Sequence, residues 1–336
     1  MKKIIITGGC GFIGHHFVEH FLKETDWDIV VLDKLNYASN GYDRLRDINA
    51  FDDKRVSIFN TDLSKPLSAG TIKEIGKVDY IINLASESHV DNSIEHPVSF
   101  TKNNIDLILN VLEYSKLVLP KLIVHFSTDE VMGTAPEGVF HKEEDPVNPG
   151  NPYSASKTGQ EAICRAYANT YGVPVIITRT MNVIGERQHP EKFVPLIIKK
   201  VLQGSPITIH ADKDCKKAGS RFYIHARNVA QAVHFLLDTK ERLSKDSPGR
   251  GVFNIVGEKE IDNLELAQFI AKHLKKDLIY EMVDFHSSRP GHDLRYALDG
   301  SKLEEAGFHF PKSLEDSLRK TINWYLENTK WITKNT

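Results

Sequence analysis

Cysteine is rare in this sequence, and its three residues lie far apart. Cys10, Cys164 and Cys215 form no CxxC pair, so neither a disulfide framework nor a cysteine-ligated zinc site is expected. The histidines do not follow the HExxH spacing of a zinc-dependent hydrolase either. We therefore predict three reduced thiols and no bound metal.

A strong net charge and a long apolar run are also missing. The 43 basic and 45 acidic side chains leave a formal net charge of -2, which is too weak to attract nucleic acid or an anionic membrane surface. The apolar run between Lys3 and Gly8 is too short for a secretory signal or a membrane span. The sequence therefore predicts a cytoplasmic globular protein with a small-molecule partner, and neither nucleic acid nor a membrane as a partner.

A glycine-rich turn follows the first strand-like run. The β-branched run at residues 3–7 leads into Gly8, Gly11 and Gly14, and helical periodicity comes next. This spacing lets the backbone approach a pyrophosphate at the helix N-terminus. A second apolar run ends at Asp33, about 20 residues later, where a carboxylate can bind an adenosine ribose and repel a 2′-phosphate. The pattern predicts an NAD site, and the alternative is an ordinary turn with Asp33 as a helix cap.

Short apolar runs alternate with helical stretches along the first half of the chain. Helical periodicity covers residues 104–116 and 155–171. Further strands are expected at residues 28–32, 56–59, 78–82, 122–126 and 173–177. The alternation favours an α/β fold with a Rossmann-type, doubly wound parallel sheet.

Four side chains that suit alcohol oxidation and water elimination follow residues 122–126. Asp129 and Glu130 are adjacent, and Tyr153 lies four positions before Lys157. On a helix, Tyr153 and Lys157 share a face, so the ammonium can stabilise a phenolate and bring its pKa nearer neutrality. Repulsion and burial can raise the pKa of one carboxyl group while the other stays ionised. An exposed Tyr-Lys pair and a solvated or capping acid pair are the alternatives.

Together these residues resemble the extended short-chain dehydrogenase/reductase superfamily, and within it the nucleoside-diphosphate-hexose 4,6-dehydratases. The resemblance covers nearly the whole chain. Its motifs are Thr7-Gly-Gly-Cys-Gly-Phe-Ile-Gly14, Asp33-Lys-Leu-Asn-Tyr-Ala-Ser-Asn40, Leu84-Ala-Ser-Glu-Ser-His-Val-Asp91, Ser127-Thr-Asp-Glu-Val131, Tyr153-Ser-Ala-Ser-Lys157, Pro190-Glu-Lys192 and Arg289-Pro-Gly-His-Asp-Leu-Arg-Tyr296. The first and fifth motifs identify only the superfamily, whereas the acid pair and residues 87–91 and 289–293 are similar to the dehydratase subgroup.

The resemblance implies a reaction without net redox change at a tightly held NAD. Tyr153, assisted by Lys157 and Thr128, would take the C4 hydroxyl proton of the sugar while hydride leaves C4. Glu130 would then remove the C5 proton, and a protonated Asp129 would donate to the departing C6 hydroxyl. Return of hydride to C6 would leave a 4-keto-6-deoxy sugar nucleotide.

The resemblance also implies domains and ligand contacts. The NAD domain would span residues 1–180, with later segments returning to it, and a smaller C-terminal lobe at residues 181–336 would mainly bind the sugar nucleotide. Cofactor contacts are expected from Gly8, Gly11, Phe12, Ile13, Gly14, Asp33, Asp62, Leu63, Tyr153 and Lys157. Substrate contacts are expected from Ser88, His89, Asn182, Glu191, Lys192, Arg221, Asn254 and Arg289. Superfamily relatives commonly dimerise through helices like those at residues 104–116 and 155–171, so a homodimer is expected.

The chain departs from the family pattern at three places. Met132 stands where the family usually has Tyr, residues 183–188 replace Asn-Tyr-Gly-Pro-Tyr-His, and residues 211–220 replace a short Gly-rich turn. The second change is expected to bring the charges of Glu186 and Arg187 near the diphosphate. The nucleotide base therefore stays open among dTDP-, UDP- and CDP-sugars.

Two other enzymes and one binding protein are the alternatives. An NDP-sugar 4-epimerase and a UDP-glucuronate decarboxylase share the oxidation at C4. Epimerases typically lack the acid pair, and decarboxylases usually have no Asp before the Glu, so Asp129 is the discriminating residue. An NAD-binding regulatory module would have little need of Tyr153 and Lys157.

Two later segments are interpreted as structural. The polar residues 238–251 predict a solvated loop. Ser313 is expected to cap a packing helix, on which Trp324 and Tyr325 need no functional explanation. The buried stripe of this helix is expected to comprise Leu314, Leu318, Ile322 and Leu326.

Overall fold

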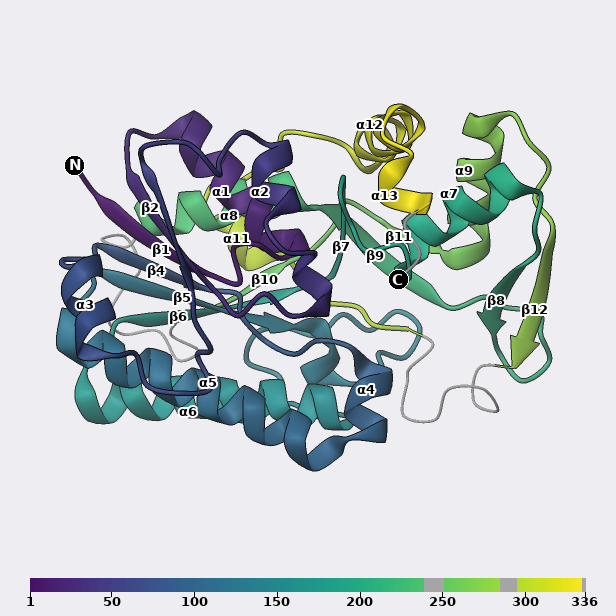
Figure 1. Ribbon diagram of the computed structural model, residues 1–336. Coiled ribbons are helices and arrows are strands. Elements are labelled where there is room, and N and C mark those ends of the chain that lie inside the picture. The colour runs from purple at the N-terminus through teal and green to yellow at the C-terminus, as the bar shows by residue number, and fades with distance from the viewer. Residues whose placement is uncertain (239–250, 285–294, 334–336) are drawn as a thin grey trace.

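A seven-stranded sheet forms the centre of the computed structural model, which describes residues 1–238, 251–284 and 295–333 (Figure 1). All seven strands are parallel, in the order β10-β6-β5-β4-β1-β2-β3. They are β1 (Lys3–Thr7), β2 (Asp28–Asp33), β3 (Val56–Asn60), β4 (Tyr80–Asn83), β5 (Leu122–Thr128), β6 (Val175–Thr180) and β10 (Val252–Ile255). The predicted α/β, doubly wound fold is confirmed, and the strand order reverses beside β1, where such sheets bind ligands.

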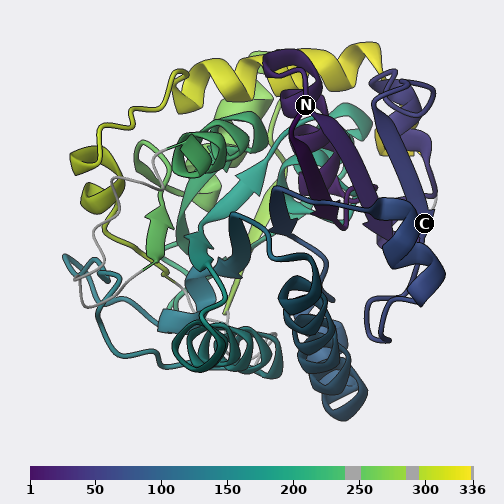
Figure 2. The same cartoon turned by 90° about the vertical axis from the view of Figure 1, so that its left-hand side faces the viewer.

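Helices cover both faces of this sheet (Figures 1 and 2). One face carries α1 (Phe12–Glu24), α2 (Asp43–Asp47), α8 (Ala226–Asp238) and α11 (Ser301–Glu305). The other carries α3 (Ala69–Ile75), α5 (Pro97–Val118) and α6 (Pro152–Tyr171). The long helices α5 and α6 pack against each other along this second face. Both faces of the sheet are therefore buried, as the continuous apolar strands require.

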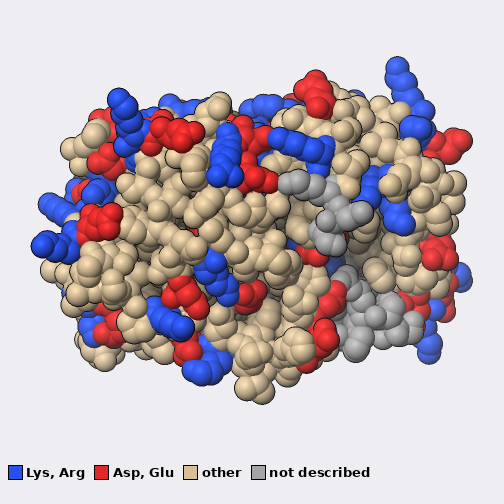
Figure 3. Space-filling view, viewed as in Figure 1, with Lys and Arg blue, Asp and Glu red and all other residues tan. Residues whose placement is uncertain are grey.

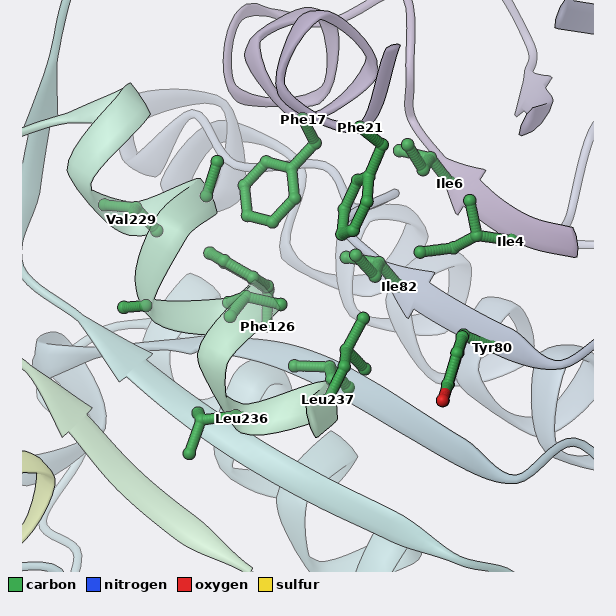
Figure 4. Packing of buried hydrophobic residues seen from close by; sticks show 14 of the residues in the cluster. Ile4, Ile6, Phe17, Phe21, Tyr80, Ile82, Phe126, Val229, Leu236 and Leu237 are labelled. Carbon is green, nitrogen blue, oxygen red and sulfur yellow. The ribbon is translucent and has the colours of Figure 1, made fainter. Parts of the chain in front are cut away.

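The alternation of side chains along β1 supplies both cores. Ile4 and Ile6 point to one face and pack with Phe17 and Phe21 of α1, and all four are fully buried (Figure 4). Ile5 points to the opposite face and joins the core beneath α5. Burial on both sides fixes β1, and with it the glycine-rich turn at its carboxyl end.

A smaller lobe lies beyond the carboxyl ends of the strands (Figure 1). It holds one sheet of β7 (Asn182–Ile184), β9 (Ser220–His225) and β11 (Glu260–Asp262) and a second of β8 (Ile207–Ala211) and β12 (Tyr280–Asp284). Its helices are α7 (Phe193–Gln203), α9 (Asn263–Leu274), α12 (Leu314–Glu327) and α13 (Lys330–Thr333). The lobes interleave, because α8 packs on α1 and β10 pairs with β6 although both come after residue 180.

Three short elements complete the large lobe, and α4 among them packs on α5 and α6. They are η1 (Tyr37–Ser39), α4 (Val90–Glu95) and η2 (Asp129–Met132). Residues 239–250, where a loop was predicted, lie outside the described part of the chain. Within the described residues, no helix is both long and apolar enough to cross a bilayer.

The surface in Figure 3 mixes both signs of charge. Among the described residues of this face, lysine and arginine side chains are interspersed with aspartate and glutamate, without a broad patch of a single sign. All three cysteines are free thiols, with Cys10 and Cys164 buried.

Candidate active site

A cavity of about 390 Å³ opens at the carboxyl edge of the central sheet and reaches the smaller lobe. Gly8, Asp33 and Thr128 line it where β1, β2 and β5 end. Asn182 and Lys192 line it from the other lobe. Its size and its place at the switch in strand order are those of a ligand site in an open α/β sheet.

The glycine-rich turn forms a cradle at the N-terminus of α1. A Cβ atom on Gly14 would lie 2.1 Å from the Gly8 carbonyl oxygen, so no other residue fits there. Gly8 adopts a φ of 68°, in the left-handed region that favours glycine. Gly11, Phe12 and Ile13 also line the cavity. The exposed amides and the positive end of the helix dipole suit a pyrophosphate.

Asp33 ends β2 beside this cradle. Its Oδ2 atom accepts a hydrogen bond from the Cys10 amide (3.0 Å), and its Oδ1 atom accepts one from the Leu35 amide (2.8 Å). Burial raises the pKa of Asp33. Asp62 and Leu63, also expected at the cofactor, line the same cavity. This group fits the adenosine end of a dinucleotide.

Thr128 and Asp129 form a hydrogen-bonded pair at the end of β5. The Thr128 hydroxyl donates to Asp129 Oδ1 at 2.9 Å. Asp129 is 5% exposed, and its Oδ2 atom is buried without a hydrogen-bond partner among the described residues. Burial raises the pKa of Asp129 to about 6. Its carboxyl group can therefore be protonated near neutrality, as a general acid requires.

Glu130 occupies a different environment from its neighbour. It is half-buried, and its Oε2 atom accepts a hydrogen bond from the Asn151 amide group at 3.1 Å. Asn151 also caps α6, where its side chain accepts from the Ser154 amide. Asn151, the cap of α6, thus positions Glu130. The two adjacent carboxyl groups differ in exposure, because Asp129 is buried and Glu130 only half-buried.

Tyr153 and Lys157 lie in the first turns of α6 and line the cavity beside the acids. Burial and the negative charge of Glu130 raise the pKa of Tyr153, and a hydrogen bond with Thr128 opposes this rise. Lys157 Nζ donates to the Phe126 carbonyl oxygen at 2.5 Å, and burial lowers its pKa to about 8. The Lys157 ammonium bonds the backbone and burial dominates the pKa of Tyr153 in this structure, so the lowering of that pKa by Lys157 stays a prediction.

Five of the expected substrate residues line the cavity. They are Ser88, His89, Asn182, Glu191 and Lys192. His89 Nε2 lies 3.7 Å from Glu191 Oε1, which joins the segment before α4 to the segment before α7. Ser88 and His89 come from the large lobe, so this group spans the junction.

The structure does not place the other three expected residues along the cavity. Asn254 is fully buried in β10, where its amide group donates to the carbonyl oxygens of His141 and Asp299. Arg221 is absent from the lining, although its charge lowers the pKa of Asp129. Arg289 lies outside the described residues. The structure therefore does not bring Asn254 to the cavity, because its side chain is committed to backbone groups.

Several lining residues were not among the expected ligands. Lys34 and Tyr37 follow β2, Arg44 lies in α2, and Gln188 and His189 precede the Glu191-Lys192 pair. Lys34 and Tyr37 belong to a family motif and could have been found from it. No sequence pattern signals Arg44, which reaches the cavity only through the packing of α2.

Comparison with known proteins assigns the family. Residues 4–255 match the model of the NAD dependent epimerase/dehydratase family. The chain belongs to this family. It is 33% identical to the dTDP-glucose 4,6-dehydratase of Salmonella typhimurium, over 98% of this chain and 94% of that protein.

Two further relatives cover the chain almost completely. It is 35% identical, over 98% of its length, to the trifunctional UDP-glucose 4,6-dehydratase/UDP-4-keto-6-deoxy-D-glucose 3,5-epimerase/UDP-4-keto-L-rhamnose-reductase RHM2 of Arabidopsis thaliana, but spans only 48% of that protein. The crystal structure of DesIV, a dTDP-glucose 4,6-dehydratase from Streptomyces venezuelae with NAD bound, superposes with a TM-score of 0.86 at 35% identity. That match covers 98% of this chain and 99% of the other.

The departures from the family pattern have structural explanations. Met132 is buried in an apolar cluster with Phe222, Tyr296 and Leu298, so it packs and does not line the cavity. Residues 211–220 form a turn in which the Asp212 carboxylate accepts from two backbone amides. Residues 185–187 are buried between α1 of the large lobe and β9 of the smaller lobe.

The histidines of α1 contain one spacing known from metal sites. His16, Glu19 and His20 follow an HxxEH pattern, which occurs in some zinc enzymes. In this family member, however, His16 Nε2 bonds the Glu186 carbonyl oxygen and His20 bonds His234. No group of His, Cys, Asp and Glu suited to a metal ion occurs among the described residues.

Proposed function

We propose that this chain is an NAD-dependent 4,6-dehydratase of a nucleoside-diphosphate hexose, dTDP-glucose or a related NDP-sugar. The observation that carries the proposal is the buried Asp129 beside a more exposed Glu130, both facing the cavity with Tyr153. A 4-epimerase oxidises C4 and returns the hydride to the same carbon without eliminating water, so it would have no use for a buried acid next to a base. The 4,6-dehydratases among the relatives support the same reaction.

Tyr153 begins the reaction by taking the proton of the C4 hydroxyl. NAD bound at the glycine cradle would supply a hydride acceptor for C4 and a hydride donor for C6, and its cationic nicotinamide would oppose the raised pKa of the phenol. The hydroxyl of Thr128 is hydrogen-bonded to Asp129 and to Tyr153. The resulting C4 ketone acidifies the C–H bond at C5.

The acid pair then eliminates water across C5 and C6. Glu130 takes the C5 proton while Asp129 gives its proton to the C6 hydroxyl, which leaves as water. Glu130 returns its proton to C5 when C6 receives hydride, and the 4-keto-6-deoxy sugar remains. Tyr153 has then gained one proton and Asp129 has lost one. Because the Thr128 hydroxyl is hydrogen-bonded to both groups, it can pass a proton from Tyr153 to Asp129 and so return both to their starting protonation states.

A panel of sugar nucleotides tests this function. Purified protein is incubated with dTDP-, UDP-, CDP- and GDP-glucose and with UDP-glucuronate, and each mixture is followed by mass spectrometry and NMR. Loss of the mass of one water, with a 4-ketone signal and no build-up of NADH, is the expected result and identifies the base. A stereochemical change without mass change would indicate a 4-epimerase, and loss of carbon dioxide from UDP-glucuronate would indicate the decarboxylase. Inertness throughout would favour an NAD-binding regulatory module.

We also propose a homodimer formed through α5 and α6. These two helices carry the exposed apolar side chains Val98, Leu117 and Tyr171, and Leu119 follows α5 directly. Size-exclusion chromatography with light scattering tests this, and a monomer at working concentration would contradict it. A cytoplasmic location is proposed because three free cysteines suit a reducing compartment.

A further inference from the structure

Residues 185–187, here called the clasp, are buried at the junction of the two lobes. They follow β7 and directly precede Gln188 and His189, which line the cavity. Glu186 is fully buried, although an isolated buried carboxylate is costly. Its partners therefore decide how this segment is held.

Two side chains from the smaller lobe and α8 bind the Glu186 carboxylate. His225 Nε2 lies 3.0 Å from Glu186 Oε2, and Arg227 Nη1 donates to Oε1 at 2.9 Å. The Arg227 amide donates to His225 Nδ1, so Nε2 carries the hydrogen and donates to the carboxylate. Burial alone would raise the pKa of Glu186, but the bond from His225 and the nearby charges hold it well below its usual range.

The large lobe holds the backbone of the same segment. His16, two residues beyond Gly14 in α1, donates from Nε2 to the Glu186 carbonyl oxygen at 3.2 Å. A Cβ on Gly185 would lie 3.1 Å from His16 Nε2 and 3.3 Å from His225 Nε2, so glycine permits this close approach. The helix that carries the glycine cradle is thereby tied to the clasp.

Arg44 extends the connection to the other wall of the cavity. Its Nε atom donates to the Arg187 carbonyl oxygen at 2.9 Å. Its Nη1 atom donates to the carbonyl oxygens of Cys10 and Ser39. One buried guanidinium therefore joins the clasp to the glycine-rich turn and to the segment after β2.

The C-terminal helices α12 and α13 also hold the clasp, directly or through Asp47. Arg187 Nε donates to Asp47 Oδ2 at 2.6 Å, and Lys330 of α13 donates to Asp47 Oδ1 at 2.8 Å. The Tyr325 hydroxyl lies 3.3 Å from the Gly185 carbonyl oxygen and 3.2 Å from that of Gln188. Elements from both lobes thus converge on the clasp. It lies immediately before residues 188–192, here called the strip, of which Gln188, His189, Glu191 and Lys192 line the cavity.

We propose that Glu186 is a positioning residue for the sugar nucleotide. It does not line the cavity. Its carboxylate, oriented by His225 and Arg227, fixes the turn that carries Gln188, His189 and the Glu191-Lys192 pair to the substrate. This inference rests on the proposed function, because it assigns that strip to the sugar nucleotide.

The variant Glu186→Gln tests the proposal while keeping the size of the side chain. A side-chain amide has one acceptor oxygen where the carboxylate has two, so it cannot accept from both His225 and Arg227, and the strip should lose its fixed position. We expect the KM for the sugar nucleotide to rise about tenfold with kcat changed much less, since misplacement by a fraction of an ångström weakens binding. NAD occupancy, read from the absorbance of the purified protein, should match the wild type.

Two further variants separate positioning from stability. Glu143→Gln alters another buried carboxylate, which accepts from the backbone amide of Asn254 and lies away from the cavity. It should lower the melting temperature without raising KM. Arg227→Met removes a partner that is 26% exposed. Because both groups act in one network, the double variant with Glu186→Gln should raise KM by less than the product of the single effects.

Direct binding keeps the test independent of turnover. Calorimetry with dTDP and UDP, which need no catalysis, should show weaker binding of the preferred nucleotide by Glu186→Gln than by the wild type. An unchanged KM and an unchanged nucleotide affinity in folded Glu186→Gln would overturn the inference, as would an equal KM rise in Glu143→Gln. If the wild type dehydrates no sugar but binds a nucleotide that Glu186→Gln binds weakly, the dehydratase proposal fails and the positioning role stands.

Discussion

At the scale of single residues, burial divides two adjacent carboxyl groups into an acid and a base. The sequence identified Asp129 and Glu130 as a pair, but not which of them is buried. The turn of η2 directs Asp129 inward and leaves Glu130 half-buried, bonded to Asn151. Asymmetry of this kind depends on the fold around the pair, which the local sequence does not encode.

Replacing Asp129 by Asn should separate oxidation from elimination. Asparagine fits the same space but has no acidic proton to give, so dehydration should fall by about 10²-fold or more. Bound NAD and the oxidation at C4 should persist, so NADH absorbance should build up after sugar nucleotide is added. Mass spectrometry and absorbance on the same sample measure both steps. Dehydration at the wild-type rate would refute the role of Asp129.

The dehydration step should also depend on pH through Asp129. Burial raises the pKa of this carboxyl group to about 6, and the acid acts only when protonated. Its protonated fraction falls as pH rises through that value, so the single-turnover rate of water loss should decline about tenfold per pH unit above it. The decline should be absent in Asp129→Asn. A dehydration rate that rises over the same range would show that another group is the acid.

Replacing Tyr153 by Phe should stop the reaction at its start. Phenylalanine keeps the ring in the half-buried site but removes the oxygen that takes the C4 proton. Hydride transfer from C4 should then fall by about 10²-fold or more, and neither NADH nor the 4-ketone should form. Stopped-flow absorbance measures this. NADH formation at a near-normal rate would exclude Tyr153 as the base.

At the scale of elements, local sequence patterns predicted the presence of a helix or strand better than which of its faces is buried. Each expected strand of the central sheet is present. The inner strands are apolar because they are buried on both faces, whereas β3 at the edge of the sheet is only partly buried. In α12, Ser313 caps as expected, but Leu326 is 43% exposed and Tyr325 is fully buried. Eleven residues complete about three helical turns, so Tyr325 returns to the face of Leu314, and counting by fours drifts off it. Tyr325 also bonds the clasp, so it does more than pack.

The turn between β1 and α1 should be intolerant of any side chain at Gly14. The variant Gly14→Ala places a Cβ 2.1 Å from the Gly8 carbonyl oxygen, so the cradle must shift and NAD should be lost. Gly70→Ala in α3 is the control, since the nearest atom to its Cβ is 3.7 Å away. NAD content after purification measures the effect. Full NAD occupancy in Gly14→Ala would contradict the assignment of the cradle.

At the scale of the whole molecule, the site exists only where the two lobes meet. The strands β1 to β6 all precede the predicted domain boundary near residue 180, but α8 and β10, which follow it, return to the large lobe. Contacts such as Arg44 with the Arg187 carbonyl oxygen join positions 143 residues apart. Neither periodicity nor motif spacing could reveal them. The cavity was predictable through its motifs, while the network that holds its walls was not.

A sugar nucleotide labelled with deuterium at C4 of glucose, with the base selected by the panel, gives the most direct test of the proposed reaction. The label should appear at C6 of the 4-keto-6-deoxy product, one water should be lost and NADH should not accumulate, because the hydride removed from C4 returns to C6. Recovery of the label at C4 in an epimerised sugar, or its retention in accumulated NADH without water loss, would contradict it.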